Sequence, residues 1–225
     1  MTMLKGILNL FLQNTCPLCQ RNTPKLFCSY CNQQLQKSCL HNPNCSWQPP
    51  IALFAWGSYG GILKKAIMMM KYENRPEIAL FLGQLLGGSW LLNSTCKYQA
   101  PVIVPIPLHP DKMKIRGFNQ SELIARGFCD VTGLRLKPHG LMRIKHTQPQ
   151  FEISADKRQN NLMGAFDLGK DFVNHYPIKP ILLVDDIYTT GATANSAAHT
   201  LDGYGINVIG FATVAKVIKR DPQNI

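Results

Sequence analysis

Residues 181–196, ILLVDDIYTTGATANS, constrain the fold more than any other stretch of the chain. Four apolar residues lead directly into Asp185 and Asp186, and residues 189–193, TTGAT, follow before a run with helical spacing. A short apolar run bounded by a turn is typical of a strand buried on both faces, as in a parallel sheet. The stretch therefore predicts a central strand over residues 181–184, a strand-to-helix turn over 185–193 and a helix after it.

The rest of the chain continues this alternation of apolar strands and helices. Strands are predicted near residues 51–60, 102–104, within 134–145 and near 206–217, and helices on both sides of 74–76 and over 118–133. Because parallel strands need crossover connections that cover the sheet, this alternation predicts an α/β fold with a parallel sheet flanked by helices.

The N-terminal part of the chain has a different composition. Residues 13–50 are rich in Cys, Asn, Gln and Pro and poor in aliphatic side chains, and the segment ends in NPNCSWQPP, which is typical of a linker. We therefore divide the chain into a small N-terminal module with its linker, residues 1–50, and a larger domain, residues 51–225.

Bulk composition narrows the class of protein. Hydrophobic residues make up 45% of the 225 residues, which is enough for a packed core. No apolar run reaches the roughly 18 residues that a membrane span needs, and residues 3–12 lack the features of a signal peptide, so we expect a cytoplasmic protein. The net charge of +11 lies upstream of residue 161 and suits nucleic acid or a polyphosphate, although a generic basic surface would give the same number.

Four cysteines form two Cys-x-x-Cys pairs, Cys16 with Cys19 and Cys28 with Cys31. Two such turns supply four thiolates to one ion, so the spacing predicts a structural Zn²⁺ site with no open position. The alternatives are a redox pair or four unrelated thiols.

The other cysteines have less regular settings. Cys39 and Cys45, with His41 between them, are either alternative ligands or bystanders, and we favour the second. Cys96 and Cys129 lie among apolar residues, which is typical of small buried side chains.

The chemistry of the turn after residue 184 favours a sugar phosphate. Backbone N–H groups and hydroxyls of a strand-to-helix turn can surround a phosphate at a helix N-terminus, and a carboxylate accepts hydrogen bonds from a ribose diol. The turn lacks the Gly-x4-Gly-Lys-Ser/Thr pattern of nucleoside-triphosphate loops. We therefore predict a ribose-5-phosphate held through Asp185, Asp186, Thr189, Thr190, Gly191, Ala192 and Thr193; the alternative is that Asp186 only caps the turn.

This stretch resembles the phosphoribosyl pyrophosphate (PRPP) loop of type I phosphoribosyltransferases. Residues 104–125, 143–166 and 71–79, together with the paired cysteines, are similar to the ComF family (GntX-like) of competence-associated proteins, and the resemblance covers nearly the whole chain. It implies a type I phosphoribosyltransferase-like domain with a small four-cysteine zinc module. One departure is that many members carry a third Cys-x-x-Cys pair where this chain has Cys39 and Cys45.

The resemblance also assigns a pyrophosphate loop. It implies that Lys112, Lys114 and Arg116 neutralise pyrophosphate, with Arg116 in direct contact and Asn119 and Gln120 orienting the loop. The alternative is that these cations only form a solvated face of the protein.

The resemblance further implies that an arm over residues 143–158 corresponds to the flexible loop that closes over substrate in type I enzymes. Its cations are Arg143, Lys145, Lys157 and Arg158, and its return is anchored by Asn161 and residues 164–166. His146 on this arm is interpreted as solvated rather than catalytic.

The resulting hypothesis is a PRPP-binding protein that acts in DNA uptake during natural transformation and handles single-stranded DNA in the cytoplasm. Its expected partners are PRPP with Mg²⁺, single-stranded DNA and other competence proteins such as a DNA helicase. Trp47, Tyr59 and Tyr72 lie near basic residues and suit base stacking, although for each of them singly we favour core packing.

The alternative hypothesis is a metabolic phosphoribosyltransferase that acts on a small base or amine. In that reaction Asp185 or Asp186 stabilises charge on the sugar ring, while Arg116 and Mg²⁺ stabilise the departing pyrophosphate. No segment selects a purine or a pyrimidine, so the acceptor, the occurrence of any transfer, the oligomeric state and the DNA surface stay open.

Overall fold

The computed structural model describes residues 15–44, 52–95, 100–144 and 164–218. Its centre is a four-stranded sheet in the order β1-β6-β5-β2, and all three pairings are parallel. The strands are β1 (Leu53–Ser58), β2 (Val102–Pro105), β5 (Ile181–Tyr188) and β6 (Val208–Lys216). The predicted α/β class with a parallel sheet is confirmed.

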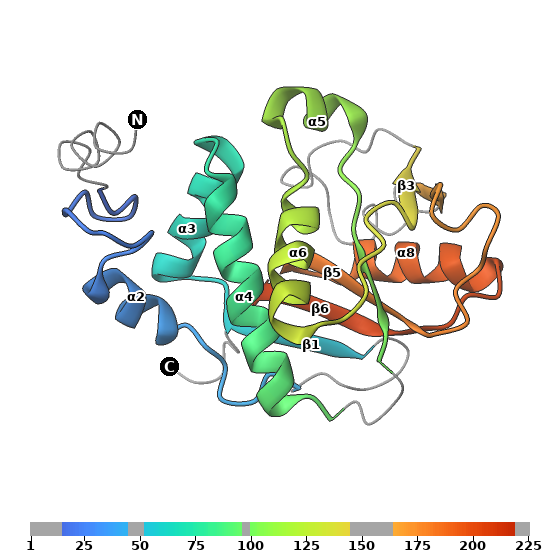
Figure 1. Ribbon diagram of the computed structural model, residues 1–225, viewed down its shortest axis with the longest axis horizontal. Coiled ribbons are helices and arrows are strands. Elements are labelled where there is room, and N and C mark those ends of the chain that lie inside the picture. The colour runs from blue at the N-terminus through green and yellow to red at the C-terminus, as the bar shows by residue number, and fades with distance from the viewer. Residues whose placement is uncertain (1–14, 45–51, 96–99, 145–163, 219–225) are drawn as a thin grey trace, which may run out of the picture.

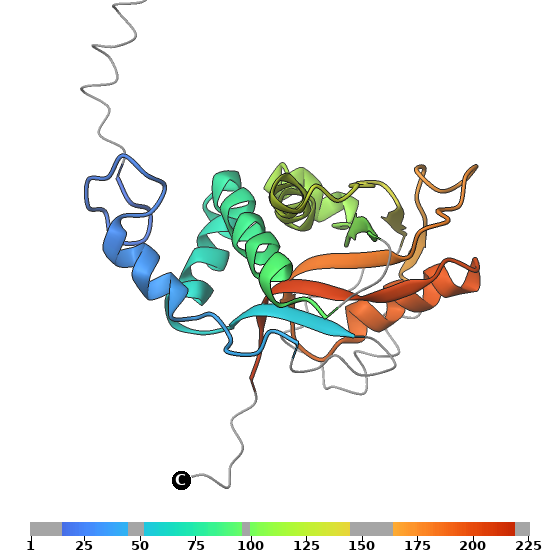
Figure 2. The ribbon, with the colours of Figure 1, turned by 60° about the horizontal axis from the view of Figure 1, so that its bottom comes forward.

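Helices cover both faces of this sheet (Figure 1; Figure 2). On one face lie α3 (Gly61–Tyr72), α4 (Pro76–Asn93) and α6 (Gln120–Thr132), and on the other lies α8 (Ala192–Gly203). The predicted helix break at residues 74–76 is confirmed, because Pro76 occupies the first turn of α4. Gly133 ends α6 in a left-handed conformation, as expected for a helix that stops there.

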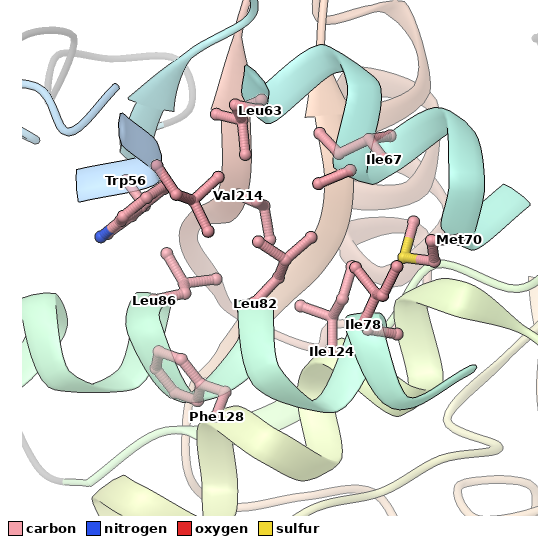
Figure 3. Close-up of a cluster of buried hydrophobic side chains, with 14 of the residues drawn as sticks. Trp56, Leu63, Ile67, Met70, Ile78, Leu82, Leu86, Ile124, Phe128 and Val214 are labelled. Carbon is pink, nitrogen blue, oxygen red and sulfur yellow. The ribbon is translucent and has the colours of Figure 1, made fainter. Parts of the chain in front are cut away.

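The hydrophobic core forms two layers, one on each face of the sheet. Alternate strand residues such as Leu182 and Val214 face α3, α4 and α6, and Figure 3 shows the aliphatic and aromatic side chains that interlock there. Leu183 and Phe211 face α8 instead and pack with Ala197. Both faces of the central strands are therefore buried, which explains their unbroken apolar sequence.

Helices α4 and α6 approach each other unusually closely because glycines stand at their contact. A Cβ at Gly83 would overlap the carbonyl oxygen of Ile124, and a Cβ at Gly127 would overlap that of Leu80. This close contact fixes the position of the first turn of α6 relative to the sheet.

The N-terminal module packs directly on the larger part of the chain. It contains α2 (Ser29–Gln36), a helix that the sequence patterns did not predict. Phe27 packs edge-to-face on Phe81 of α4, and Lys65 of α3 donates to the carbonyl of Leu18 at 2.6 Å. Residues 38–43 then run along the outer edge of β1 through backbone hydrogen bonds. The proposed boundary at residue 50 lies outside the described residues, so the division into two domains stays a prediction.

A small antiparallel pair flanks the main sheet. It joins β3 (Leu141–Arg143) to β4 (Phe166–Leu168), of which only the first was predicted as a strand. The predicted anchoring of the arm's return at residues 164–166 is confirmed for Ala165 and Phe166, because Ala165 accepts a hydrogen bond from the backbone of Ile144; Asn161 lies outside the described residues. In the described parts of the chain, none of the helices combines the length and hydropathy that a bilayer crossing requires.

The close α4–α6 contact gives a stability prediction. We expect Gly83→Ala to lower the free energy of unfolding by about 1–3 kcal/mol, because the added methyl group must displace the α6 backbone. Gly88→Ala in the same helix has open space around its new Cβ and is the matched control. We expect this control to be neutral or slightly stabilising, since Ala is the better helix former. Urea denaturation checks both; equal effects of the two changes would contradict the close packing.

Candidate functional site

A cleft of about 900 Å³ opens at the carboxyl ends of β2 and β5. This is the edge of an open α/β sheet where ligands characteristically bind. Seven of the predicted site residues line it: Lys112, Lys114, Arg116, Asp185, Asp186, Thr189 and Thr193. Thr190, Gly191 and Ala192 belong to the turn beside it without lining it.

Strand β5 continues further than the sequence indicated. Its pairing with β2 ends at Val184, but its pairing with β6 continues to Tyr188. Asp185 and Asp186 therefore belong to the strand rather than to the turn, and they occupy the part of β5 that no longer has β2 beside it. This placement leaves the two carboxylates facing the cleft from a rigid element.

The side chain of Asp185 contacts the first turn of helix α6. Its Oδ1 accepts hydrogen bonds from the hydroxyl of Ser121 at 2.6 Å and from the backbone N–H of Asp186 at 2.8 Å. Burial and the neighbouring Asp186 carboxylate nevertheless raise the pKa of Asp185 to about 7. The site therefore contains two neighbouring acids, and the hydrogen bonds that Asp185 accepts offset their mutual repulsion only in part.

Asp186 is buried and paired with Lys71, a residue that the sequence analysis did not assign to the site. The Lys71 Nζ lies 2.8 Å from Asp186 Oδ2, and the two side chains are only 17% and 6% exposed. Burial disfavours the charge on Lys71, but the Asp186 and Asp185 carboxylates outweigh it and raise the pKa of Lys71. One signal was available: Lys71 follows the buried Leu63 and Ile67 at four-residue spacing, and a lysine on an apolar helix face requires a partner.

The turn between β5 and α8 depends on Gly191. Gly191 has a φ of 80°, and a Cβ there would overlap the hydroxyl of Tyr188. Helix α8 begins at Ala192, so the N–H groups of its first turn point back toward the Thr189–Gly191 turn. The geometry agrees with a small anion-binding concavity next to the two acids.

The predicted pyrophosphate residues lie on a short helix rather than on an irregular loop. This helix, α5 (Pro110–Arg116), begins after His109 and ends at Gly117 with a φ of 80°. Lys112 and Arg116 are half-buried, whereas Lys114 is exposed. The pKa of Lys112 is lowered by burial and by the nearby cations, of which Arg143 has the largest effect. A cluster of like charges of this kind gains most from an anionic ligand.

Asn119 and Gln120 orient this segment, as predicted. Asn119 caps α6 by accepting from Ser121 N and donates to the carbonyl of Ile106 at 3.1 Å. Gln120 accepts from Arg116 Nη1 at 2.5 Å. The guanidinium of Arg116 is therefore positioned before any ligand arrives.

The predicted arm is described only at its two ends. Arg143 on β3 lines the cleft, and its guanidinium lies 5.5 Å from the centre of the Phe166 ring. Burial lowers the pKa of Arg143. Lys145, His146, Lys157 and Arg158 lie outside the described residues, so their assignments stay predictions.

The three aromatic residues suggested for base stacking differ in where they lie. Tyr59 packs against the core, which supports the simpler interpretation. Tyr72 is 65% exposed and lines the cleft, with the Arg116 guanidinium carbon 5.8 Å from its ring centre. Trp47 lies outside the described residues.

The four paired cysteines come together at one point. The sulfur atoms of Cys16, Cys19, Cys28 and Cys31 lie within 4.8 Å of one another, and three of the residues are buried. Tetrahedral Zn–S bonds of about 2.3 Å place sulfurs about 3.8 Å apart, so the cluster fits a four-thiolate metal ion after slight contraction. The four thiols perturb one another: a backbone hydrogen bond from Cys31 N lowers the pKa of Cys28 to about 7, whereas burial and the neighbouring thiols raise the pKa of Cys31.

The remaining described cysteines lie apart from this cluster. Cys39 is exposed and donates to the carbonyl of Leu40, as expected for a bystander. Cys129 is half-buried, and burial raises its pKa to about 12, in line with a small packed side chain. Cys45 and Cys96 lie outside the described residues.

Three curated proteins are similar to this chain over most of its length. Competence protein F of Haemophilus influenzae is 30% identical over 213 residues, which cover 91% of each protein. DNA utilization protein YhgH of Escherichia coli is 31% identical over 192 residues, or 83% of each. Competence protein ComFC of Streptococcus pneumoniae is 28% identical over 194 residues, covering 86% of this chain and 76% of the relative. No protein-family model matches.

Solved structures give weaker likenesses. Adenine phosphoribosyl transferase from Trypanosoma brucei has a TM-score of 0.40 at 9% identity, and the match covers 87% of this chain and 85% of the transferase. Glutamine PRPP amidotransferase from B. subtilis has a TM-score of 0.41 at 16% identity, and the match covers 65% of this chain but 30% of the amidotransferase. Because these scores lie below 0.5, the fold assignment rests on the strand order of the chain itself.

The cysteine cluster predicts one tightly bound metal ion per chain. We expect Cys31→Ser to abolish metal retention and to lower the unfolding midpoint, because three thiolates cannot complete the tetrahedron. Cys39→Ser removes a thiol outside the cluster and is expected to retain one ion. Metal content by plasma mass spectrometry checks both variants. A full metal content in Cys31→Ser would contradict the assignment.

The Lys71–Asp186 pair predicts a pH-dependent loss of stability. We expect Lys71→Met to cost about 3 kcal/mol of unfolding free energy at pH 7, because it leaves a buried carboxylate without its cation. Lys71 lowers the pKa of Asp185, so without Lys71 that pKa rises further above its unfolded value near 3.9, and the loss shrinks as pH falls through that raised range. Lys64→Met, at an exposed position of the same helix, is the control and should cost little at either pH. Urea denaturation at pH 7 and pH 4.5 measures this; an equal loss at both values would exclude a charge effect.

Proposed function

Because the chain belongs to the ComF family of competence proteins, we propose that it acts in DNA uptake, binds PRPP in the cleft and handles single-stranded DNA in the cytoplasm. The carrying observation is the cleft itself. Two carboxylates, a glycine-dependent hydroxyl-rich turn and three α5 cations gather at one edge of one sheet. Each of these groups matches a different part of one ligand.

The sugar phosphate occupies the β5–α8 side of the cleft in this proposal. The 5-phosphate lies against the Thr189–Gly191 turn and the first N–H groups of α8, where the helix dipole favours an anion. The ribose hydroxyls donate to Asp185 and Asp186, which are acceptors when ionised. Ligand binding then competes with Lys71 and Ser121 for the same carboxylate oxygens.

The pyrophosphate occupies the α5 side. Lys112, Lys114 and Arg116 supply positive charge there, and Arg116 is already oriented by Gln120. Lys71 lines the cleft, interacts with the two acids and with Arg116, and contributes a further cation once it leaves Asp186. The strongly negative donor therefore meets charge of the opposite sign along most of its length.

Two metal ions accompany this proposal. Mg²⁺ prefers oxygen ligands and would be held by PRPP oxygens with Asp185 or Asp186 at its periphery, where it would stabilise a departing pyrophosphate. Zn²⁺ fits the four-cysteine cluster and contributes to folding rather than to chemistry, since four thiolates leave no open position.

The role in DNA uptake draws on the relatives, whose names refer to competence and DNA utilization. The net charge of +11 suits a polyanionic partner, and the exposed Lys114 shows that the cationic cleft reaches the surface. Contact with a DNA helicase or another competence protein remains part of this proposal.

A metabolic phosphoribosyltransferase is the second candidate. Its supporting observation is the size of the cleft: about 900 Å³ is near the upper end of small-molecule sites, which leaves room for an acceptor beside PRPP. In that case Asp185, Asp186 and Arg116 are the catalytic residues.

The PRPP assignment predicts a specific loss of binding. We expect the double change Asp185→Asn and Asp186→Asn to weaken Mg²⁺-PRPP binding at least tenfold, because amides hold the ribose diol less strongly than carboxylates. The control is Asp130→Asn with Asp202→Asn, which removes the same charge from exposed positions. Titration calorimetry measures both, with thermal unfolding to verify the fold. Wild-type affinity in the cleft variant would overturn the PRPP assignment.

Two measurements separate the candidates. A DNA-handling protein should bind single strands with an affinity that falls steeply as salt rises, because phosphate contacts release counterions. A metabolic transferase should instead release pyrophosphate from PRPP when the correct base or amine is supplied. Absent or salt-insensitive DNA binding would contradict the first candidate, and no release across an acceptor panel would contradict the second.

A further inference from the structure

Tyr72 is held at the mouth of the cleft by a tight turn. It is the last residue of α3, next to Lys71, whose side chain reaches Asp186. The chain then reverses through Asn74, which has a φ of 51°, and Pro76 starts α4. Both residues restrict the turn, so the ring stands at a fixed place on the rim rather than on a long loop.

The Tyr72 ring does not belong to the hydrophobic core. Tyr72 is 65% exposed, whereas Tyr59 packs against the core. Ile115 of α5 is 88% exposed and lines the same cleft. Two large apolar side chains therefore border an opening whose floor is ionic, and a ligand with one planar apolar part and one charged part suits such an opening.

The guanidinium of Arg116 extends the platform. Its carbon lies 5.8 Å from the centre of the Tyr72 ring, and its Nη1 donates a hydrogen bond to Gln120. Phenol rings and guanidinium planes are the surfaces on which nucleobases stack, and such stacking tolerates any base. The pair thus offers a planar surface that the cations of the cleft adjoin.

The charge of the cleft agrees with a ligand that carries phosphate as well as a base. Five cations line it, namely Lys71, Lys112, Lys114, Arg116 and Arg143, against the two acids Asp185 and Asp186. A positive excess remains after Lys71 is paired. A stacking surface beside such an excess is the usual combination in single-strand binding sites.

We propose that Tyr72, together with the Arg116 guanidinium, forms a nucleobase-stacking platform at the mouth of the cleft. The base comes either from a single-stranded nucleic acid or from a free base or nucleoside. This inference deepens the proposed function and rests on it in one respect, namely that PRPP binds in the cleft below the platform.

The test uses the full-length protein and fluorescence anisotropy with two probes. One is an oligothymidylate of roughly 12 nucleotides, and the other is an abasic strand of the same length, which keeps the phosphates and lacks the bases. We expect Tyr72→Ala to weaken oligothymidylate binding about fivefold or more and to leave abasic binding unchanged. Tyr72→Phe keeps the ring and should retain most of the affinity. Equal binding of oligothymidylate by wild type and Tyr72→Ala would overturn a platform for strands.

Tyr30→Ala is the matched control. Tyr30 on α2 is 52% exposed and has an arginine, Arg21, 5.1 Å from its ring centre, but it does not line the cleft. The same loss in Tyr30→Ala as in Tyr72→Ala would show a general effect of removing surface tyrosines and would overturn the platform.

Two further arms separate the source of the base and the PRPP assignment. Thymidine and adenosine, tested by calorimetry with Mg²⁺-PRPP present, show whether a free base uses Tyr72; dependence in this arm alone supports a free-base platform, and dependence in neither arm overturns the proposal. If the wild type fails to bind PRPP while the base-dependent effect of Tyr72 persists, the PRPP-binding part of the proposed function fails and the platform stands.

Discussion

The ion pair between Lys71 and Asp186 is the interaction on which the candidate site depends. Two adjacent carboxylates at the end of a buried strand repel each other and lose hydration, so the fold must supply a cation next to them. Helix α3 supplies it, and the pair ties that helix to β5 at 2.8 Å. The same lysine lines the cleft, so the group that stabilises the two acids is also available to an anionic ligand.

Other features hold this arrangement in place. Glycines let α6 approach α4, and at the start of α6 Ser121 donates to Asp185 and Asn119 donates to the carbonyl of Ile106. On the far side of α3, the cysteine module packs on the same helix through Lys65 and Leu18 (Figure 1). The N-terminal cysteine module thus supports the helix that carries Lys71 and Tyr72, two residues that line the cleft.

The sequence predicted the elements whose signals are local. Apolar runs located the strands, Pro76 and Gly133 marked helix ends, and the Cys-x-x-Cys spacing identified a cluster whose geometry fits a metal. Relations between distant segments escaped it. Asp185 and Asp186 were assigned to a turn because the sequence does not reveal that β6 outlasts β2 as a partner of β5. Lys71 was missed because its partner lies more than a hundred residues away, and the cations after residue 109 form a helix whose start depends on His109 and Pro110.

The central claim is that one cleft binds the whole of PRPP, with the ribose on its carboxylate side and the pyrophosphate on its cationic side. A crystal structure of the protein with PRPP and Mg²⁺ tests it most directly. The account predicts the 5-phosphate at the Thr189–Gly191 turn, the ribose hydroxyls on Asp185 and Asp186, the pyrophosphate toward Arg116, and Lys71 withdrawn from Asp186. A ligand bound elsewhere, or bound in the cleft with the Lys71–Asp186 pair intact and no sugar contact to either acid, would contradict it.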